Sequence, residues 1–292
     1  MLIKEKLENL KFTNSEQIIV DYLLKEQLNI QYKSTSQIAK ETYSSKSTIV
    51  KVAQRLHFNG WSDFKEAYLN ELKYWENHHF EIDANYPFTK QDNLLKVAQK
   101  IALLEQSAIE DTCSLLDYAT LKQAVSIIQK ATYTHLFALS NNLLISQEFK
   151  YNMARIKKRV DVHTVQGEAM FEATLANKEE CAIIISYSGE TETIVKIAQL
   201  LHRKQVPMIV ITNIGESSIS KLAQCVLKMS TRERLYSKIA TYANDASITY
   251  LLDVLYSCIF QLDYEKNSEL RRDTSMIFEA SRHTNFSLLK EK

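Results

Sequence analysis

The residues best suited to carry out chemistry lie in IIISYSGETETIVKIAQLL, the stretch from Ile183 to Leu201. Ser186, Ser188 and Thr191 surround Gly189 there, between an apolar run and an amphipathic helical pattern. The chain contains only four glycines, whereas average usage would give about 20. A glycine at this turn therefore indicates that the backbone requires one.

The turn between the apolar run and the helix has the features of an anion-binding site. The first turn of a helix presents unpaired N–H groups and the positive end of the helix dipole. Gly189 lets a ligand approach the backbone, and the hydroxyl groups of Ser186, Ser188 and Thr191 add donors. Such a cradle, without lysine or metal, suits a phosphate monoester. The alternative is an ordinary capped helix with no ligand.

The C-terminal half of the chain has the pattern of an α/β domain. Short β-branched runs alternate with helical patterns, and they read HLFAL, VDVHTV, CAIIIS, VPMIVIT and CVLKMS. Continuous apolar runs are typical of strands covered on both faces, so they predict a parallel sheet. Ligands of such sheets bind at the carboxyl ends of the strands, where Ser186 to Thr191 lie. ATYANDASITYLLDVLYSCIF then predicts a long closing helix, suited to a dimer contact.

The N-terminal residues 13–73 predict a succession of helices. We expect Asn14 to cap the first helix, Ser36 to open a short second helix and Gly60 to end the third. The stretch STSQIAKETYSSKSTIVKVAQRLHFNGWSDFK has the layout of a helix-turn-helix. In that motif, the first residues of the second helix read base edges in the major groove.

Local charge in this stretch is compatible with a nucleic-acid partner, although the whole chain carries a net charge of only +1. Basic residues outnumber acidic ones between Lys33 and His57, where Glu41 is the single acid. We expect base or phosphate contacts from Ser45, Lys46, Ser47, Thr48 and Lys51. We expect contacts to the DNA backbone from Thr35, Ser36 and Arg55. The alternative is a three-helix bundle with a solvated face.

The totals are those of a globular protein with two domains. The chain has 292 residues, of which 45% are hydrophobic and 24% charged. Its four cysteines form no CxxC pair, so we expect reduced thiols and neither a metal nor a cofactor. The longest apolar runs are too short to cross a bilayer, and the N-terminus does not resemble a secretory signal. We therefore expect a cytoplasmic protein without a membrane partner.

SYSGET, followed one strand later by ITNIGESSISKLA, resembles the sugar isomerase (SIS) domain. The likeness covers about residues 131–260 and implies a three-layer sandwich with a five-stranded parallel sheet. It also implies that Ser186, Ser188, Gly189 and Thr191 bind the phosphate of a phosphosugar. Glu233 lies where SIS domains often place a carboxylate near the sugar.

One loop departs from the SIS pattern. SIS domains usually have G-x-G-x-S after the first strand, but FALSNN places Ala138 and Ser140 at the glycines and Asn142 at the serine. The resemblance implies that Ser140 and Asn142 still take part in phosphate binding, because the Asn142 amide can donate a hydrogen bond.

The segment from Thr13 to Trp75 resembles the N-terminal domain of the RpiR family of bacterial transcription regulators. The likeness is carried by QIAKETYSSKSTIVKVAQRLHFNGWSDFK. The family usually has glycine where this chain has Tyr43 and His57, and arginine in place of Lys51. RpiR proteins join this domain to a C-terminal SIS domain, in the order found here.

The sequence therefore predicts a regulator with an α N-terminal and an α/β C-terminal domain. Residues 1–76 form the helix-turn-helix domain, 77–93 a linker and 94–292 the SIS domain with its N-terminal helices. The predicted partners are promoter DNA and a phosphosugar effector, and the predicted assembly is a homodimer or a dimer of dimers. Two alternatives stay open. One is a sugar-phosphate isomerase with Glu233 as its carboxylate and His163 or His202 as its imidazole, and the other is a regulator whose effector pocket has decayed.

Overall fold

The computed structural model describes residues 3–77 and 82–279, and the chain divides into two compact units. The first unit runs to Asp83 and the second begins at Ala84, except that Ile214–Ser217 group with the first. This division falls within the residues assigned above to a linker, whose limits stay a prediction. Each unit is described by itself.

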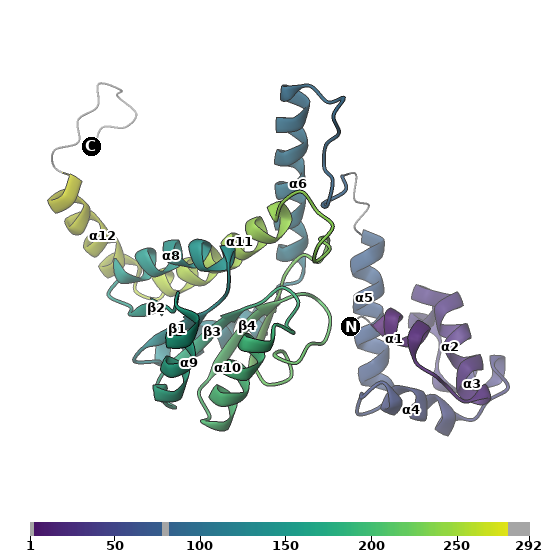
Figure 1. Ribbon diagram of the computed structural model, residues 1–292. Helices are drawn as coiled ribbons and strands as arrows, with labels where there is room; N and C mark the ends of the chain where they lie inside the picture. Colours follow the sequence, from purple (N-terminus) through teal and green to yellow (C-terminus); the bar gives the residue numbers. More distant parts are fainter. Residues whose placement is uncertain (1–2, 78–81, 280–292) are drawn as a thin grey trace. The chain divides into compact units, whose positions relative to one another are not determined.

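The first unit is helical (Figure 1). Its elements are α1 (Ile3–Asn9), α2 (Asn14–Glu26), the 3₁₀ helix η1 (Gln27–Tyr32), α3 (Thr35–Glu41), α4 (Lys46–Arg55) and α5 (Trp61–Asn77). Its core is built from one apolar face of each helix, with Ile19, Ile38, Ile49 and Phe64 fully buried. The helical half of the predicted fold is confirmed.

The helix ends differ from three of the expectations above. Thr13 rather than Asn14 caps α2, through a capping box with Glu16. Ser34 rather than Ser36 caps α3, because its hydroxyl accepts a hydrogen bond from Gln37 N at 3.2 Å. The expectations for Asn14 and Ser36 are therefore wrong by one and two residues.

The expectation that Gly60 ends the third helix is also wrong. The chain leaves α4 at His57, which has a φ of 69°, and Gly60 precedes α5. Tyr43, in the turn between α3 and α4, has a φ of 48°. Glycine is favoured at positive φ because it has no Cβ, which explains why glycine suits both positions.

The second unit contains five strands and seven helices among its described residues. In chain order they are α6 (Leu94–Ser114), α7 (Tyr118–Lys130), β1 (Thr134–Phe137), α8 (Asn141–Ala154), β2 (Val160–Val162), α9 (Gln166–Leu175), β3 (Cys181–Ile185), α10 (Glu192–Arg203), β4 (Met208–Thr212), β5 (Cys225–Lys228), α11 (Tyr242–Gln261) and α12 (Tyr264–Glu279).

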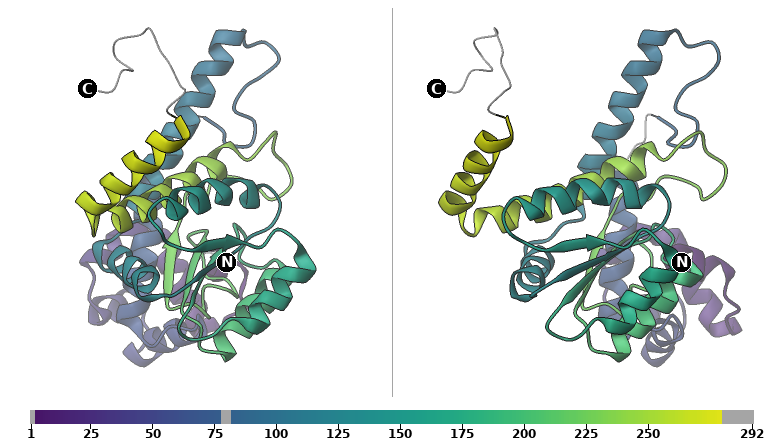
Figure 2. Two further views of the ribbon diagram at one scale, coloured as in Figure 1. Left: turned by 90° about the vertical axis from the view of Figure 1, so that its left-hand side faces the viewer. Right: turned by 60° about the vertical axis from the view of Figure 1, so that its left-hand side comes forward.

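The strands form one parallel sheet in the order β2-β1-β3-β4-β5. Side chains alternate between two buried layers. Ile183 and Ile185 pack with residues of α7, α8 and α11, whereas Ala182 and Ile184 pack with residues of α9 and α10 (Figure 2). Helices on both faces explain the continuous apolar strands. The predicted three-layer sandwich with a five-stranded parallel sheet is confirmed.

The predicted closing helix is α11, and most of its apolar surface is used within the unit. Ile248, Leu251 and Leu255 are fully buried, and α11 packs against α6, α7 and α8. Large exposed apolar side chains lie on α6, where Leu94 and Leu95 are 89% and 78% exposed, and on α8, where Leu144 is 72% exposed. None of the described helices is long and apolar enough to span a membrane.

Candidate functional site

The sheet order places a topological switch point between two neighbouring strands. From β1 the chain crosses outward to β2, whereas β3 is followed by β4 and β5 on the opposite side. The direction of winding therefore reverses between β1 and β3, and such switch points generally bind ligands in a crevice at the carboxyl ends of their strands. The loops at residues 138–142 and 186–191 follow these two strands.

The loop after β3 is held by its own serines. Ser186 is buried and its Oγ accepts a hydrogen bond from Gly189 N at 3.2 Å, while Ser188 Oγ accepts one from Glu190 N at 3.2 Å. Gly189 has a φ of 67°, as the sequence argument for a glycine here requires. Each hydroxyl that accepts from the backbone still has its own proton to donate.

Thr191 completes this loop as the residue that precedes α10. It is exposed, and its hydroxyl makes no cap hydrogen bond to the helix. The first turn of α10 thus presents its N–H groups without a side-chain acceptor from Thr191. Three hydroxyl groups and a helix N-terminus converge at one strand end, which is an arrangement suited to a dianionic phosphate.

The loop after β1 differs in its backbone. Ser140 has a φ of 53° and a ψ of −131°, a conformation that costs a residue with a Cβ about 1–3 kcal/mol. SIS domains, which this loop resembles, usually have glycine at this position. The positive φ explains that preference, because glycine has no Cβ. Ala138 is buried, Ser140 is exposed and Asn142 is half-buried at the start of α8.

Glu233, the predicted sugar carboxylate, is enclosed by the protein. Its side chain is 0% exposed, and Oε1 accepts hydrogen bonds from Ala243 N at 2.8 Å and Asn244 N at 3.0 Å. Oε2 lies 2.8 Å from Lys238 Nζ. Glu233 therefore stabilises the N-terminus of α11 in this structure, and its contact with a sugar stays a prediction.

Tyr187, which the sequence analysis gave no role, connects the serine loop to Glu233. Its hydroxyl donates to Glu233 O at 2.7 Å and accepts from Glu233 N at 3.1 Å. Lys238 Nζ lies 5.7 Å from the centre of the Tyr187 ring. The position is variable in the motif, so no sequence signal pointed to it.

Two buried acceptor atoms at the start of α11 have no partner among the described residues. Asn244 Oδ1 and Asp245 Oδ1 form no hydrogen bond there, whereas Asp245 Oδ2 accepts from Asn141 Nδ2 at 2.6 Å and from Thr241 Oγ1 at 2.8 Å. Burial raises the pKa of Asp245 above its ordinary value. A buried acceptor without a donor is costly to the fold. The only sequence signal was a polar Asn-Asp pair at the start of an apolar helix.

The histidines proposed for the isomerase alternative lie elsewhere. His202 is in the last turn of α10, about 15 Å along the axis from its first residue, and its Nδ1 lies 2.9 Å from Leu222 O. His163 is buried beside His135 and Glu172, three residues that could together hold a metal ion. The described contacts of both histidines are thus with residues outside the serine loop.

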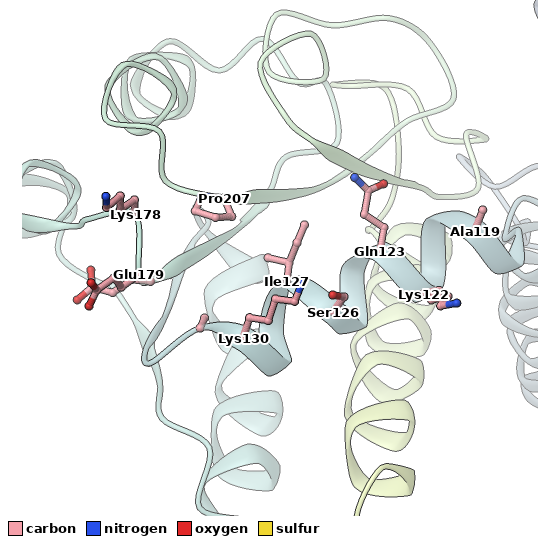
Figure 3. A pocket seen from close by; sticks show the side chains of 11 residues that line it. Ala119, Lys122, Gln123, Ser126, Ile127, Lys130, Lys178, Glu179 and Pro207 are labelled. Atoms are coloured by element: carbon pink, nitrogen blue, oxygen red, sulfur yellow. The ribbon is translucent and has the colours of Figure 1, made fainter.

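A groove of about 620 Å³ lies at the opposite edge of the sheet (Figure 3). It is lined by α7 residues such as Lys122 and Ser126, and by Glu179 and Pro207, which precede β3 and β4. These are the amino ends of the strands. The groove is therefore separate from the crevice at the carboxyl ends.

In the first unit, the start of α4 carries the predicted DNA contacts. Ser45 caps the helix by accepting from Thr48 N at 3.1 Å, and its Oγ lies 2.6 Å from Ser47 Oγ. Lys46, Ser47 and Lys51 are exposed, and neither lysine forms an ion pair with another described residue. This surface is suited to phosphate or base contacts.

The remaining predicted DNA contacts are divided between exposed and engaged side chains. Ser36 is exposed and Thr35 is half-buried in the first turn of α3. Arg55 lies at the other end of α4, where its NH1 atom is 2.7 Å from Glu16 Oε2 and its guanidinium lies 5.5 Å from the Phe12 ring centre. A phosphate contact of Arg55 would compete with this ion pair.

Two domain families match this chain. Residues 1–73 match the helix-turn-helix domain of the rpiR family, and residues 127–252 match the SIS domain. The chain is 19% identical to the Vibrio vulnificus NanR protein complexed with ManNAc-6P. That similarity covers 96% of this chain and 99% of that chain, with a TM-score of 0.60.

Two further solved structures are similar to the second unit. The sugar isomerase domain of an RpiR transcription factor from Sphaerobacter thermophilus is 13% identical over 61% of this chain and 98% of that chain, with a TM-score of 0.55. A candidate sugar-phosphate isomerase from Listeria monocytogenes is 15% identical over 66% and 100%, also with a TM-score of 0.55. At these identities the similarities establish the fold.

Proposed function

The chain belongs to the RpiR family of transcription regulators, and we propose that it controls sugar-metabolism promoters by binding DNA through α4 and a phosphosugar beside Ser186. The observation that carries this proposal is that one chain contains both a candidate DNA-binding surface and a candidate phosphate site. The first unit presents the exposed lysines of α4, and the second presents an anion cradle at a switch point. An enzyme would have no use for the first.

The phosphate of the effector is expected to bind Ser186, Ser188, Gly189 and Thr191, with Ser140 and Asn142 on the facing loop. A phosphosugar carries the dianionic group that these hydroxyl and N–H donors suit.

The structure also suggests how occupancy reaches the DNA-binding unit. Asn85 follows Asp83, the last residue of the first unit, by two positions. Its Oδ1 accepts from Arg234 N at 2.7 Å, and its carbonyl oxygen accepts from Ile239 N at 2.9 Å. The segment between β5 and α11 is thus hydrogen-bonded to Tyr187 and to Asn85, which lies at the start of the second unit. We expect this segment to have two arrangements that differ in their affinity for DNA. An effector that binds one arrangement more tightly than the other would shift the population and so change DNA binding.

The test is DNA binding in the presence of phosphosugars. Fluorescence anisotropy of labelled DNA from upstream of the gene is expected to show salt-sensitive binding that one member of a phosphosugar panel changes. The panel includes N-acetylmannosamine 6-phosphate. Ser188→Ala is expected to raise the concentration of effector required by about tenfold, because one hydrogen bond to a charged group is lost.

Ser126→Ala, at the opposite edge of the sheet, is the matched control and should leave the response unchanged. An unchanged response in Ser188→Ala would show that the phosphate binds elsewhere. The absence of salt-sensitive DNA binding would contradict the regulator itself.

Lys51→Ala is expected to weaken binding to all DNA sequences by about the same factor, because a lysine on a phosphate carries little base information. The slope of log K against log salt should fall by about 0.9 for each phosphate contact removed. Lys204→Ala, on the second unit, is the control. A slope that does not change in Lys51→Ala would remove this lysine from the interface.

We propose that the second unit senses its ligand without converting it. Isomerisation requires an acid and a base over the sugar carbons, but Glu233 is enclosed and His202 lies at the far end of α10. Turnover of a sugar phosphate that is abolished by Glu233→Gln would instead favour the isomerase. A pocket that has decayed would show no response to any phosphosugar.

We further propose a cytoplasmic homodimer or dimer of dimers, because paired half-sites on DNA match two-fold symmetry. The exposed Leu94 and Leu95 of α6 are the apolar residues best placed for such a contact. Light scattering of the purified protein would give its mass, and a monomer would contradict this assembly.

A further inference from the structure

A second group of polar side chains lies on the face of the sheet covered by α9 and α10. His135 belongs to β1, His163 directly follows β2 and Glu172 lies on α9. One ligand atom from each lies within 4.8 Å of the others. The two imidazole rings are only 4% and 9% exposed. The sequence analysis expected no metal because the cysteines form no CxxC pair; these two histidines and the glutamate are far apart along the chain, and the fold brings them together.

The two imidazole rings already have nearly the spacing that a shared metal ion requires. His135 Nδ1 lies 3.0 Å from His163 Nε2. Zinc–nitrogen bonds of 2.0–2.1 Å in a tetrahedron place two ligand nitrogens about 3.3 Å apart. Binding one ion therefore requires the hydrogen bond to be replaced: the two nitrogens separate by about 0.3 Å and the rings turn so that both lone pairs point at the ion.

The opposite nitrogen of His135 is held by a carboxylate. His135 Nε2 lies 3.1 Å from Glu180 Oε2, and Glu180 Oε2 also accepts from Asn177 N at 3.1 Å. A carboxylate at Nε2 favours a proton on that nitrogen, so the Nδ1 lone pair accepts from His163 Nε2 in this structure and becomes available when a metal ion replaces that hydrogen bond. This arrangement is typical of histidines that bind metal ions.

The charge of the cluster favours a cation. The Glu172 carboxylate forms no hydrogen bond or ion pair with another described residue. Glu172 and Glu180 thus bring two carboxylates to the two imidazole rings, and a dication would balance their charge.

We propose that His135, His163 and Glu172 bind a divalent transition-metal ion, and that Zn²⁺ is the ion their two nitrogens and one carboxylate match best. Three protein ligands leave a fourth position for water. This site is independent of the phosphosugar crevice, because it uses none of the residues assigned to the effector.

The test uses the full chain after treatment with a chelator and dialysis. Calorimetric titration with Zn²⁺ is expected to detect a site that Glu172→Gln weakens at least tenfold and that His163→Gln abolishes. Co²⁺ bound at the same site should give the intense visible absorption of a four-coordinate ion. His202→Gln is the matched control, because its ring is bonded to Leu222 O away from the cluster.

Glu172→Gln keeps the test valid if a histidine variant fails to fold, because Glu172 is only half-buried. Far-UV circular dichroism of each metal-free variant checks folding. Zn²⁺ binding that is equal in wild type and Glu172→Gln, or no binding by the wild type, would show that His135 and His163 form only a buried hydrogen-bonded pair. Neither result depends on DNA or phosphosugar binding, so the outcome is separate from that of the proposed function.

Discussion

Replacing Asp111 with alanine is expected to lower the free energy of unfolding of the second unit by about 3–5 kcal/mol. Asp111 on α6 forms an ion pair with Arg232, and the two side chains are 1% and 5% exposed. Arg232 also donates to Ser107 Oγ at 2.6 Å, and Asp111 accepts from Ser230 Oγ at 3.1 Å. Removing the carboxylate leaves a buried guanidinium without its counter-charge, which is why the loss is large.

The chain provides an internal control for this measurement. Both tryptophans, Trp61 and Trp75, belong to the first unit, so their fluorescence reports that unit while far-UV circular dichroism reports both. We expect Asp111→Ala to shift the dichroism transition and leave the fluorescence transition in place. Glu192→Ala removes an exposed ion pair with Lys196 and should leave the free energy of unfolding almost unchanged. A similarly small loss in Asp111→Ala would show that the buried pair contributes little.

Tyr187→Phe is expected to separate effector binding from its effect on DNA. The substitution removes both hydrogen bonds between the Tyr187 hydroxyl and Glu233 and keeps the ring. Coupling between two sites is typically 5–150-fold. If the segment after β5 carries this coupling, saturating effector should change the DNA affinity of the variant by less than about fivefold. The affinity of the variant for the effector itself should change little.

Two measurements on the same protein decide this prediction. Calorimetry gives the affinity for the phosphosugar, and anisotropy gives the change in DNA affinity at saturating effector. Tyr151→Phe, an exposed tyrosine on α8, is the control. A full response in Tyr187→Phe would show that coupling takes another route, and a loss of phosphosugar binding would make Tyr187 part of the ligand site instead.

Much of the fold could be predicted from local patterns. The apolar runs at β1 to β5 are continuous because helices cover both faces of the sheet, and this property is visible in the sequence itself. Gly189 was predictable for the same kind of reason. A positive φ between a strand and a helix favours glycine, and this chain uses glycine rarely.

Helix ends were less predictable, because neighbouring residues compete for the same cap. Ser34 and Ser36 both have side chains that can cap a helix. Ser34 is the cap because Gln37 lies three residues later: Gln37 N donates to Ser34 Oγ, and Gln37 Oε1 accepts from Ser34 N. His57 and Ser140 adopt positive φ without being glycine. Surrounding structure imposes that conformation, so composition gave no sign of it.

By itself the sequence determined the two-domain architecture and the serine loop that forms the candidate phosphate site. Only the tertiary structure decided the partners of these residues. It joined Tyr187 to Glu233, Asn141 to Asp245 and His135 to His163. The physical reason is that a turn or a helix is encoded by residues a few positions apart. Contacts between residues tens of positions apart depend on how the strands are ordered in the sheet.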